Sequence, residues 1–251
     1  MRAAILAAGV GRRLGPRAEA EPKVLLSFGG RSLLERHLNA LHAIGVTEVA
    51  IGVGFEACRV RAELGRLRLP PSMAVSTVLN PDFTRGSVVT LWSLRAFLTR
   101  GGDVLVMDGD VLYDRHILGR LAETRHRNCF LIDPSHALDD ETMKLALKDG
   151  APVDFRKRIE RPFDRCAESV GFFRLTETVA AKLVEAAKAL IDRGDADDYF
   201  EEALREVLLA EPPGTFGAED VAGLPWIEID FPEDVIRAER EILPALPAED
   251  R

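Results

Sequence analysis

The sequence of 251 residues predicts an α/β fold in which a mixed, mostly parallel sheet lies between two layers of helices, a Rossmann-like three-layer α/β/α arrangement. Three observations predict it. Short apolar runs alternate with longer amphipathic stretches over the first half of the chain, as in strand–helix–strand units. After residue 130, turn signals between short apolar runs indicate antiparallel strands instead. A hydrophobic content of 47% is sufficient for a full core.

The first half of the chain contains four expected strands and three expected helices. The first helix has the clearest boundaries, because Ser32 and Glu35 form a capping box and Gly45 follows its last apolar residue. A helix after residue 57 ends before the Pro70-Pro71 pair. We expect strands at 3–8, 48–53, 73–79 and 104–107, and helices at 33–44, 57–67 and 87–98.

The second half is predicted to contain a small antiparallel region, two long helices and a closing strand and helix. Its expected elements are strands at 129–132, 143–147 and 170–174, a turn at 149–150, helices at 178–192 and 197–209, a strand at 226–229 and a helix at 232–242. The tail after Pro244 is expected to be frayed. We therefore predict one domain over 1–251, with a nucleotide-side half (1–130), an acceptor-side half (131–225) and a closing segment (226–244).

Composition excludes several classes of function. The chain carries 41 acidic and 33 basic residues, and its net charge of −8 disfavours binding to nucleic acid or to an anionic membrane surface. Cys58, Cys129 and Cys166 are too widely spaced to indicate a disulfide framework or a zinc site. The apolar run 3–8 is too short for a signal peptide. We expect a soluble, cytoplasmic protein.

The strongest motif is a glycine-rich turn after the first strand, which reads Leu6-Ala7-Ala8-Gly9-Val10-Gly11-Arg12-Arg13-Leu14. Small residues there let backbone amides approach a phosphate closely, and Arg13 and Lys23 add cations. A dinucleotide fingerprint needs a third glycine where Leu14 stands, and a P-loop needs a Gly-Lys-Ser/Thr sequence that is missing. A glycine turn alone is also compatible with a purely structural turn.

The turn and the following Pro22-Lys23 pair together resemble the signature of the sugar-phosphate nucleotidylyltransferase superfamily, the MobA-like NTP transferases. The resemblance implies a nucleotidyltransferase (GT-A-like) fold. It also implies that Leu6, Ala7, Ala8, Gly9 and Gly11 bind the nucleotide, and that Arg13 and Lys23 are catalytic residues that meet its phosphates.

Acidic residues follow two of the predicted strands and suggest a metal site. Asp108-Gly109-Asp110 ends the strand at 104–107, at the sheet edge where open α/β sheets bind ligands. Carboxylate oxygens suit Mg²⁺. By resemblance, Asp110 and Asp230 hold the ion. We expect the side chains of Asp108 and Asp110 to point in opposite directions, so Asp108 is either an alternate ligand or a nucleotide contact. Asp230 is alternatively the N-cap of the last helix.

The remaining candidates also rest on resemblance, here to the phosphocholine and inositol-phosphate cytidylyltransferase branch. It implies nucleotide contacts at Asn80, Gly86 and Ser87, although Ser87 is also a plausible helix cap. It implies acceptor contacts at Lys144, Lys157 and Glu168. The acidic run 195–202 suits either a cationic acceptor or the start of a helix, where acidic side chains are expected.

The reaction predicted from these residues needs no protein nucleophile, because an acceptor phosphate oxygen can attack the α-phosphorus of a nucleoside triphosphate in line. We expect Mg²⁺ as cofactor, CTP as donor, and a small phosphorylated or phosphonate alcohol or amine as acceptor. A sugar-phosphate or inositol-phosphate nucleotidylyltransferase, a non-catalytic nucleotide-sensing module and a glycosyltransferase with an Asp-x-Asp motif remain alternatives. A homodimer is compatible with the sequence, whereas nucleic-acid and membrane partners are not expected.

Overall fold

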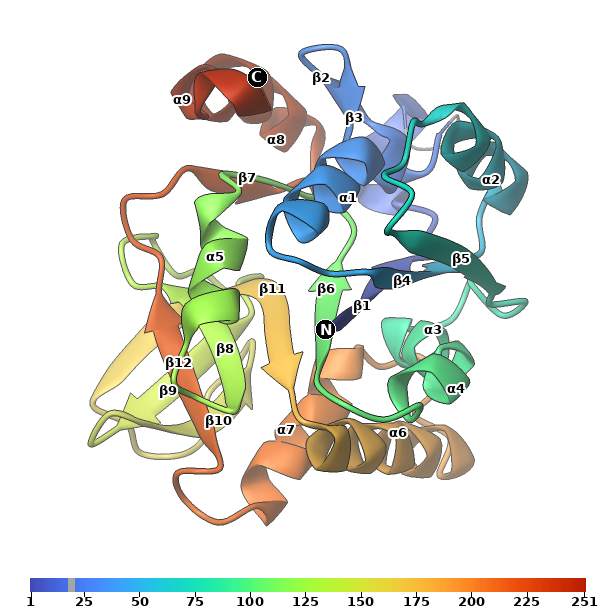
Figure 1. The fold of residues 1–251 in the computed structure, drawn as a ribbon. Helices are drawn as coiled ribbons and strands as arrows, with labels where there is room; N and C mark the ends of the chain where they lie inside the picture. Colours follow the sequence, from blue (N-terminus) through green and yellow to red (C-terminus); the bar gives the residue numbers. More distant parts are fainter. Residues whose placement is uncertain (18–20) are drawn as a thin grey trace.

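The computed structural model describes residues 1–17 and 21–251 and has a nine-stranded central sheet with helices on both faces (Figure 1). The main path through this sheet is β10-β9-β11-β6-β1-β4-β5, and β8 and β12 extend it beside β11. The predicted three-layer α/β/α fold with a mixed, mostly parallel sheet is confirmed.

The parallel part of the sheet consists of β1 (Arg2–Ala7), β4 (Glu48–Val53), β5 (Ala74–Leu79) and β6 (Val104–Asp108). β1 pairs in parallel with β4 on one side and with β6 on the other. β1 and β4 are almost entirely buried, which explains their unbroken apolar sequences. The four strands end at one edge of the sheet, and this edge carries the glycine turn and the Asp108-Gly109-Asp110 turn.

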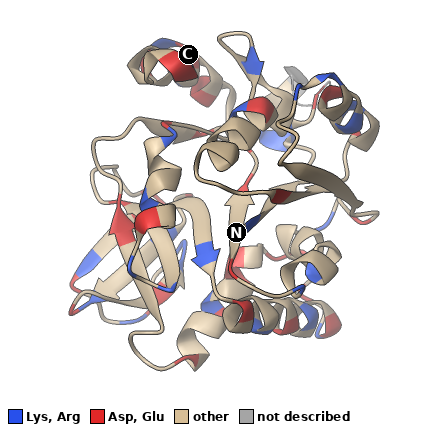
Figure 2. Cartoon of the chain, viewed as in Figure 1, with Lys and Arg blue, Asp and Glu red and all other residues tan. Residues whose placement is uncertain are grey.

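Alternate residues of β1 point into two different cores. Ala3 and Ile5 pack with helices on one face, whereas Ala4 and Leu6 pack with helices on the other. The first face carries α1 (Leu33–Ala43), α2 (Ala57–Arg66) and α5 (His116–Glu123). The second carries α3 (Ser87–Ser93), α4 (Arg95–Leu98), α6 (Glu177–Asp192) and α7 (Phe200–Ala210). Figure 2 shows acidic and basic positions interspersed along α6, as expected of a solvated helix face.

The antiparallel region begins at β11 (Arg165–Leu175), which runs antiparallel to β6 and continues past it to pair with β9 and β8. β9 (Lys144–Lys148) and β10 (Ala151–Arg156) form the hairpin predicted from the turn at 149–150, where both residues have positive φ. β8 (Asn128–Asp133) also pairs with β12 (Phe216–Asp220). The boundary expected at residue 130 therefore falls inside β8, within one continuous sheet.

The closing segment lies outside the main sheet. β13 (Trp226–Glu228) pairs antiparallel with β7 (Val111–Tyr113), and α8 (Pro232–Arg237) follows. The expected frayed tail is wrong. The chain continues through a π-helical turn (Ala238–Ile242), α9 (Leu243–Ala245) and a 3-10 turn (Ala248–Asp250). Leu246 is fully buried, and the arginine at position 31 donates to the carbonyl of Glu249 at 2.7 Å. These contacts order the tail.

Other differences from the expected elements are local. The helix expected at 87–98 is split at Leu94, whose N–H bonds to the carbonyl of Leu91, three residues back, as well as to that of Thr90. Three short elements were not predicted from the sequence: β7, α5 and β12. The short hairpin of β2 (Ser27–Phe28) and β3 (Arg31–Ser32) precedes α1. The three cysteines, all in the described part of the chain, are free. Among the described residues, no helix is long and apolar enough to cross a membrane.

Candidate active site

The glycine-rich turn connects β1 to a short 3-10 helix (Arg12–Arg17) and forms one wall of a cavity of about 340 Å³. Gly11 has a φ of 66°, and its carbonyl accepts a hydrogen bond from the N–H of Leu14 at 2.9 Å. A Cβ atom at Gly9 would meet no atom within 4 Å, so the space above this residue is open. The turn therefore exposes backbone to the cavity, as close approach of a phosphate requires.

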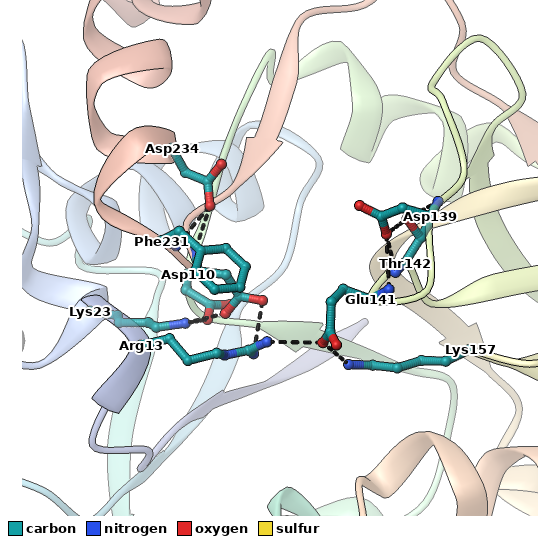
Figure 3. A network of polar contacts seen from close by, with 10 residues as sticks. Arg13, Lys23, Asp110, Asp139, Glu141, Thr142, Lys157, Phe231 and Asp234 are labelled. Carbon is teal, nitrogen blue, oxygen red and sulfur yellow. Dashed lines mark hydrogen bonds and ion pairs between the residues drawn. The ribbon is translucent and has the colours of Figure 1, made fainter. Parts of the chain in front are cut away.

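Four charged side chains meet at the edge of this cavity (Figure 3). Lys23 Nζ lies 2.8 Å from Asp110 Oδ2 and 2.7 Å from Asp230 Oδ1. Arg13 Nη2 lies 2.9 Å from Asp230 Oδ2, and the Arg13 guanidinium stacks over the ring of Phe231, 5.2 Å from its centroid. The structure thus brings together the two predicted catalytic cations and the two predicted metal ligands, although Lys23 and Asp230 are 207 residues apart in the chain.

Strand pairing in the closing segment places Asp230 beside Asp110. Glu228 of β13 pairs with Val111 of β7, and the N–H of Ile229 donates to the carbonyl of Asp110 at 2.9 Å. The alternative role of Asp230 as a helix N-cap is wrong, because Phe231 occupies the cap position of α8. The carboxylate that accepts hydrogen bonds from the backbone at Asp230 and Phe231 is that of Asp234, at 3.0 and 2.8 Å. The Asp230 carboxylate therefore does not cap the helix and binds Arg13 and Lys23 instead.

Glu228 is a third carboxylate at this point, and the sequence analysis did not select it. Oxygen atoms of Asp110, Glu228 and Asp230 all lie within 4.8 Å of one another. Its spacing from Asp230 is a usable signal, because residues two apart on an extended strand point to the same face. Glu228 is exposed at the end of β13, with the carboxylates of Asp110 and Asp230 beside it. An all-oxygen donor set of this kind fits a hard cation such as Mg²⁺.

Lys23 carries the positive charge that offsets these carboxylates. Its side chain is only 15% exposed. Burial alone lowers the pKa of Lys23, but the carboxylates of Asp110 and Asp230 outweigh burial, so that the net pKa is raised. The ammonium is therefore charged at neutral pH and held at the centre of the site.

A second cavity of about 180 Å³ begins where the first ends, and Arg13, Lys23, Asp110 and Tyr199 line both. Asp108 and Asp110 both line this second cavity, so the expectation that they point in opposite directions is wrong. The two aspartates are two residues apart, and alternate side chains of extended chain share a face. A Cβ at Gly171 would lie 2.4 Å from Asp108 Oδ2, which shows how closely β11 passes this carboxylate.

Glu201, in the first turn of α7, also lines the second cavity. Among the described residues, its Oε2 atom is buried without a hydrogen-bond partner. Burial raises the pKa of Glu201. The pKa of Asp108 is also raised, first by burial and then by the charge of Glu201. The two carboxylates thus share a small, weakly hydrated space.

Lys157 reaches the second cavity from the opposite side, as Figure 3 shows. Its Nζ lies 2.9 Å from Glu141 Oε2, and the same oxygen lies 3.4 Å from Arg13 Nη1, so Glu141 links the two cations. Lys157 Nζ also lies 5.0 Å from the ring centroid of Tyr199. Lys144 does not take part in this group. Its ammonium donates to the backbone carbonyls of Asp139 and Lys157, which gives it a structural role.

Glu168 lines a third cavity of about 410 Å³ next to the carboxylate cluster. Its Oε2 lies 2.7 Å from Nδ1 of His136, and the His136 ring stacks on Trp226 with centroids 4.9 Å apart. The Glu168 carboxylate is thus already paired with a histidine. The acceptor role predicted for Glu168 remains a prediction.

Some of the residues predicted to contact the nucleotide line the two cavities, and the others are held in structural contacts. Leu6, Ala7, Gly9 and Gly11 line the first cavity, whereas Ser87 and Asp108 line the second. The others are occupied structurally, and their binding role remains a prediction. Ala8 is buried, and its carbonyl accepts a hydrogen bond from the N–H of Phe55. Asn80 is fully buried and is hydrogen-bonded to the Thr90 hydroxyl and to the N–H of Asp82. Gly86 packs against the backbone of 197–198.

Three lining residues of the first cavity come from the loop after β5, which the sequence analysis indicated only through its neighbours. They are Phe83, Thr84 and Arg85. The ring of Phe83 packs tightly at Gly54, where an added Cβ would lie 2.2 Å from Phe83 Cβ. No simple periodic pattern marks this loop, so its position at the cavity follows from packing.

The fold and the site geometry agree with a comparison with known protein families. Residues 3–188 match the model of the MobA-like NTP transferase domain. The chain belongs to this family.

Individual relatives agree with this placement. The chain is 28% identical over 250 residues to a CMP-5'-(3-aminopropyl)phosphonate synthase from Streptomyces rubellomurinus, covering 97% of this chain. It is 30% identical over 244 residues to a bifunctional IPC transferase and DIPP synthase from Rubrobacter xylanophilus, covering 96%. This MobA-like chain spans only 39% and 52% of the length of these two curated relatives. The solved inositol-1-phosphate CTP transferase from T. maritima shares the fold, with a TM-score of 0.72, 20% identity and 98% of each chain covered.

Proposed function

We propose that this MobA-like chain transfers a cytidylyl group from CTP to a phosphate or phosphonate oxygen of a small acceptor and releases pyrophosphate, with Mg²⁺ as cofactor. One observation carries the proposal. The first and second cavities meet at Arg13, Lys23 and Asp110, so a nucleotide and an acceptor bound in them would face each other across these charges. CTP is favoured as donor because relatives are named for CMP and CTP chemistry.

In the proposed reaction an acceptor oxygen attacks the α-phosphorus of the nucleotide, forming a new P–O bond. The bond from the α-phosphorus to the bridging oxygen breaks, and pyrophosphate leaves with that electron pair. Arg13 and Lys23 stabilise the charge on the transferring group and on the pyrophosphate. Asp110 and Asp230, with Glu228 beside them, would hold Mg²⁺, which would neutralise phosphate charge when bound.

The charges of the second cavity favour an acceptor that carries an amine. Asp108 and Glu201 line this cavity, whereas its cations Arg13, Lys23 and Lys157 are already paired with other carboxylates. Burial raises the pKa of both carboxyl groups, and an ammonium group beside them would offset this effect by stabilising their charged forms. The proposed acceptor is therefore an aminoalkyl phosphonate or a phosphorylated amino alcohol, in preference to inositol phosphate or a sugar phosphate.

The test is pyrophosphate release from each of the four nucleoside triphosphates with Mg²⁺, with a panel of these four acceptor classes and a chelator control. We expect release with CTP and an amine-bearing acceptor only. Release with inositol phosphate or a sugar phosphate would overturn the acceptor class. No release with any pair would favour the alternative of a nucleotide-sensing module.

Glu201→Gln tests the acceptor assignment within the same assay. We expect it to raise the KM for the amine acceptor and to leave the KM for CTP unchanged. Glu206→Gln is the matched control, because Glu206 lies on the same helix but pairs with Arg193 at the surface. Equal KM values for Glu201→Gln and the wild type would remove Glu201 from the acceptor site.

A further inference from the structure

A buried histidine lies directly behind the candidate active site. His37 is on α1, on the helix face that packs against β1, β4 and β6, and it is fully buried. Leucines fill the neighbouring positions of this face, Leu34, Leu38 and Leu41. A buried imidazole costs free energy unless both ring nitrogens are hydrogen-bonded, so its presence here calls for a physical reason.

Both ring nitrogens of His37 have partners. Nδ1 lies 3.2 Å from the hydroxyl of Tyr113, and Nε2 lies 3.1 Å from the carbonyl oxygen of Gly109. The His37 and Tyr113 rings also stack, with centroids 5.4 Å apart. Tyr113 comes from β7, so the pair connects a helix, a strand and the turn that carries Asp108 and Asp110.

Only one arrangement of protons satisfies these contacts. Burial lowers the pKa of His37 to about 4, so the ring is neutral at neutral pH and carries a single proton. The carbonyl of Gly109 can only accept, so this proton is on Nε2. Nδ1 then accepts from the Tyr113 hydroxyl, whose pKa is raised by burial, so that the hydroxyl remains protonated. Tyr113 therefore donates to His37, and His37 donates to Gly109.

The Gly109 carbonyl belongs to the peptide unit that continues into Asp110. The N–H of Gly109 is held as well, by the carbonyl of Leu6 at 3.0 Å. A Cβ at position 109 would lie 2.9 Å from that same oxygen, which shows how tightly the turn sits on β1. Both peptide groups of Gly109 are thus fixed, and with them the direction in which the Asp110 side chain leaves the turn.

We propose that His37 and Tyr113 are positioning residues that hold the Asp110 carboxylate toward the metal site through the Gly109 carbonyl. The inference rests on the proposed function, since it assumes that Asp110 binds a divalent cation. Partners that orient a ligand in this way affect metal affinity or activity by about 10- to 100-fold when removed.

The experiment measures Mn²⁺ binding to the protein without nucleotide, by electron paramagnetic resonance, well below the unfolding temperature of each variant. Tyr113→Phe removes the hydroxyl with little change of shape, and His37→Leu removes both hydrogen bonds. His37→Gln keeps an amide donor for Gly109. We expect weaker Mn²⁺ binding, by about 10-fold or more, in the first two variants and partial rescue in the third.

The matched control is His42→Leu, because His42 lies on the same helix with its side chain exposed. If His37 and Tyr113 have only a structural role, their variants will have lower melting temperatures but the same Mn²⁺ affinity as the wild type. This result would overturn the inference. If His37→Leu does not fold, Tyr113→Phe decides alone. Absence of Mn²⁺ binding by the wild type would instead contradict the metal site of the proposed function.

Discussion

At the scale of single residues, the site is a set of charges that stabilise one another. The Lys23 ammonium lies between the carboxylates of Asp110 and Asp230, and Arg13 contacts Asp230 from the other side. These charges are partly buried, so their interactions are screened less by solvent than those of the surface pairs. The lysine is the residue on which both candidate metal ligands depend for charge compensation.

Replacing Lys23 with alanine is expected to lower kcat/KM by about 100- to 1,000-fold, because a positioned cation is lost from the transferring phosphoryl group. Pyrophosphate release under the conditions of the wild-type enzyme measures the effect. Lys148→Ala is the control, since Lys148 is exposed at the β9–β10 hairpin. Wild-type turnover in the Lys23 variant would remove this residue from the chemistry.

At the scale of elements, the second cavity depends on how α7 is attached to β10. Asp154 of β10 is fully buried, and its Oδ1 accepts from Nε of Arg205 of α7 at 2.6 Å. Burial alone would raise the pKa of Asp154, but the hydrogen bond from Arg205 and the N–H groups of Glu160 and Phe155 lower it. This pair fixes the helix whose first turn carries Glu201.

Arg205→Met is therefore expected to lower the free energy of unfolding by about 3 kcal/mol or more, because it leaves a buried carboxylate without its charged partner. Urea denaturation measures the change. Arg193→Met removes two surface ion pairs at the end of α6, with Asp195 and Glu206, where the arginine side chain is 48% exposed. It should cost less than about 1 kcal/mol. If the two variants lose similar free energies of unfolding, the buried pair contributes no more to stability than the surface contacts.

At the scale of the whole molecule, the acceptor-side strands and the closing segment are joined through Trp226. The indole Nε1 donates to Asp133 Oδ2 at 2.9 Å, and His136 stacks on the indole ring. His136 also pairs with Glu168 of β11. The same cluster therefore links β8, β11 and β13, which are far apart in the sequence.

The contribution of His136 to stability should depend on pH. The hydrogen bond to Glu168 and the charge of Asp133 raise the pKa of His136 above its ordinary value. The stabilisation is thus fully present below the unfolded-state pKa of about 6.5 and is lost as the pH rises through the folded-state pKa. We expect the difference in unfolding free energy between the wild type and His136→Asn to shrink over this range. A difference that does not depend on pH would contradict the assignment.

Much of the fold was predictable because it follows from local patterns. The apolar runs at 3–8 and 48–53 indicated buried parallel strands, and Ser32 caps α1 as expected, with its hydroxyl accepting from the N–H of Glu35. The tail was mispredicted because its order comes from tertiary contacts of Leu246 and Glu249, which leave no periodic signal.

The sequence by itself determined the α/β class, the glycine turn, and the chemical identity of Arg13, Lys23, Asp110 and Asp230. Only the tertiary structure decided which side chains meet. The pairing of β13 with β7 brings Glu228 and Asp230 to Asp110, and the packing of α1 brings His37 to Gly109. Spacing along the chain records which groups are available, but contacts between distant segments depend on strand register and helix packing, which no local pattern encodes.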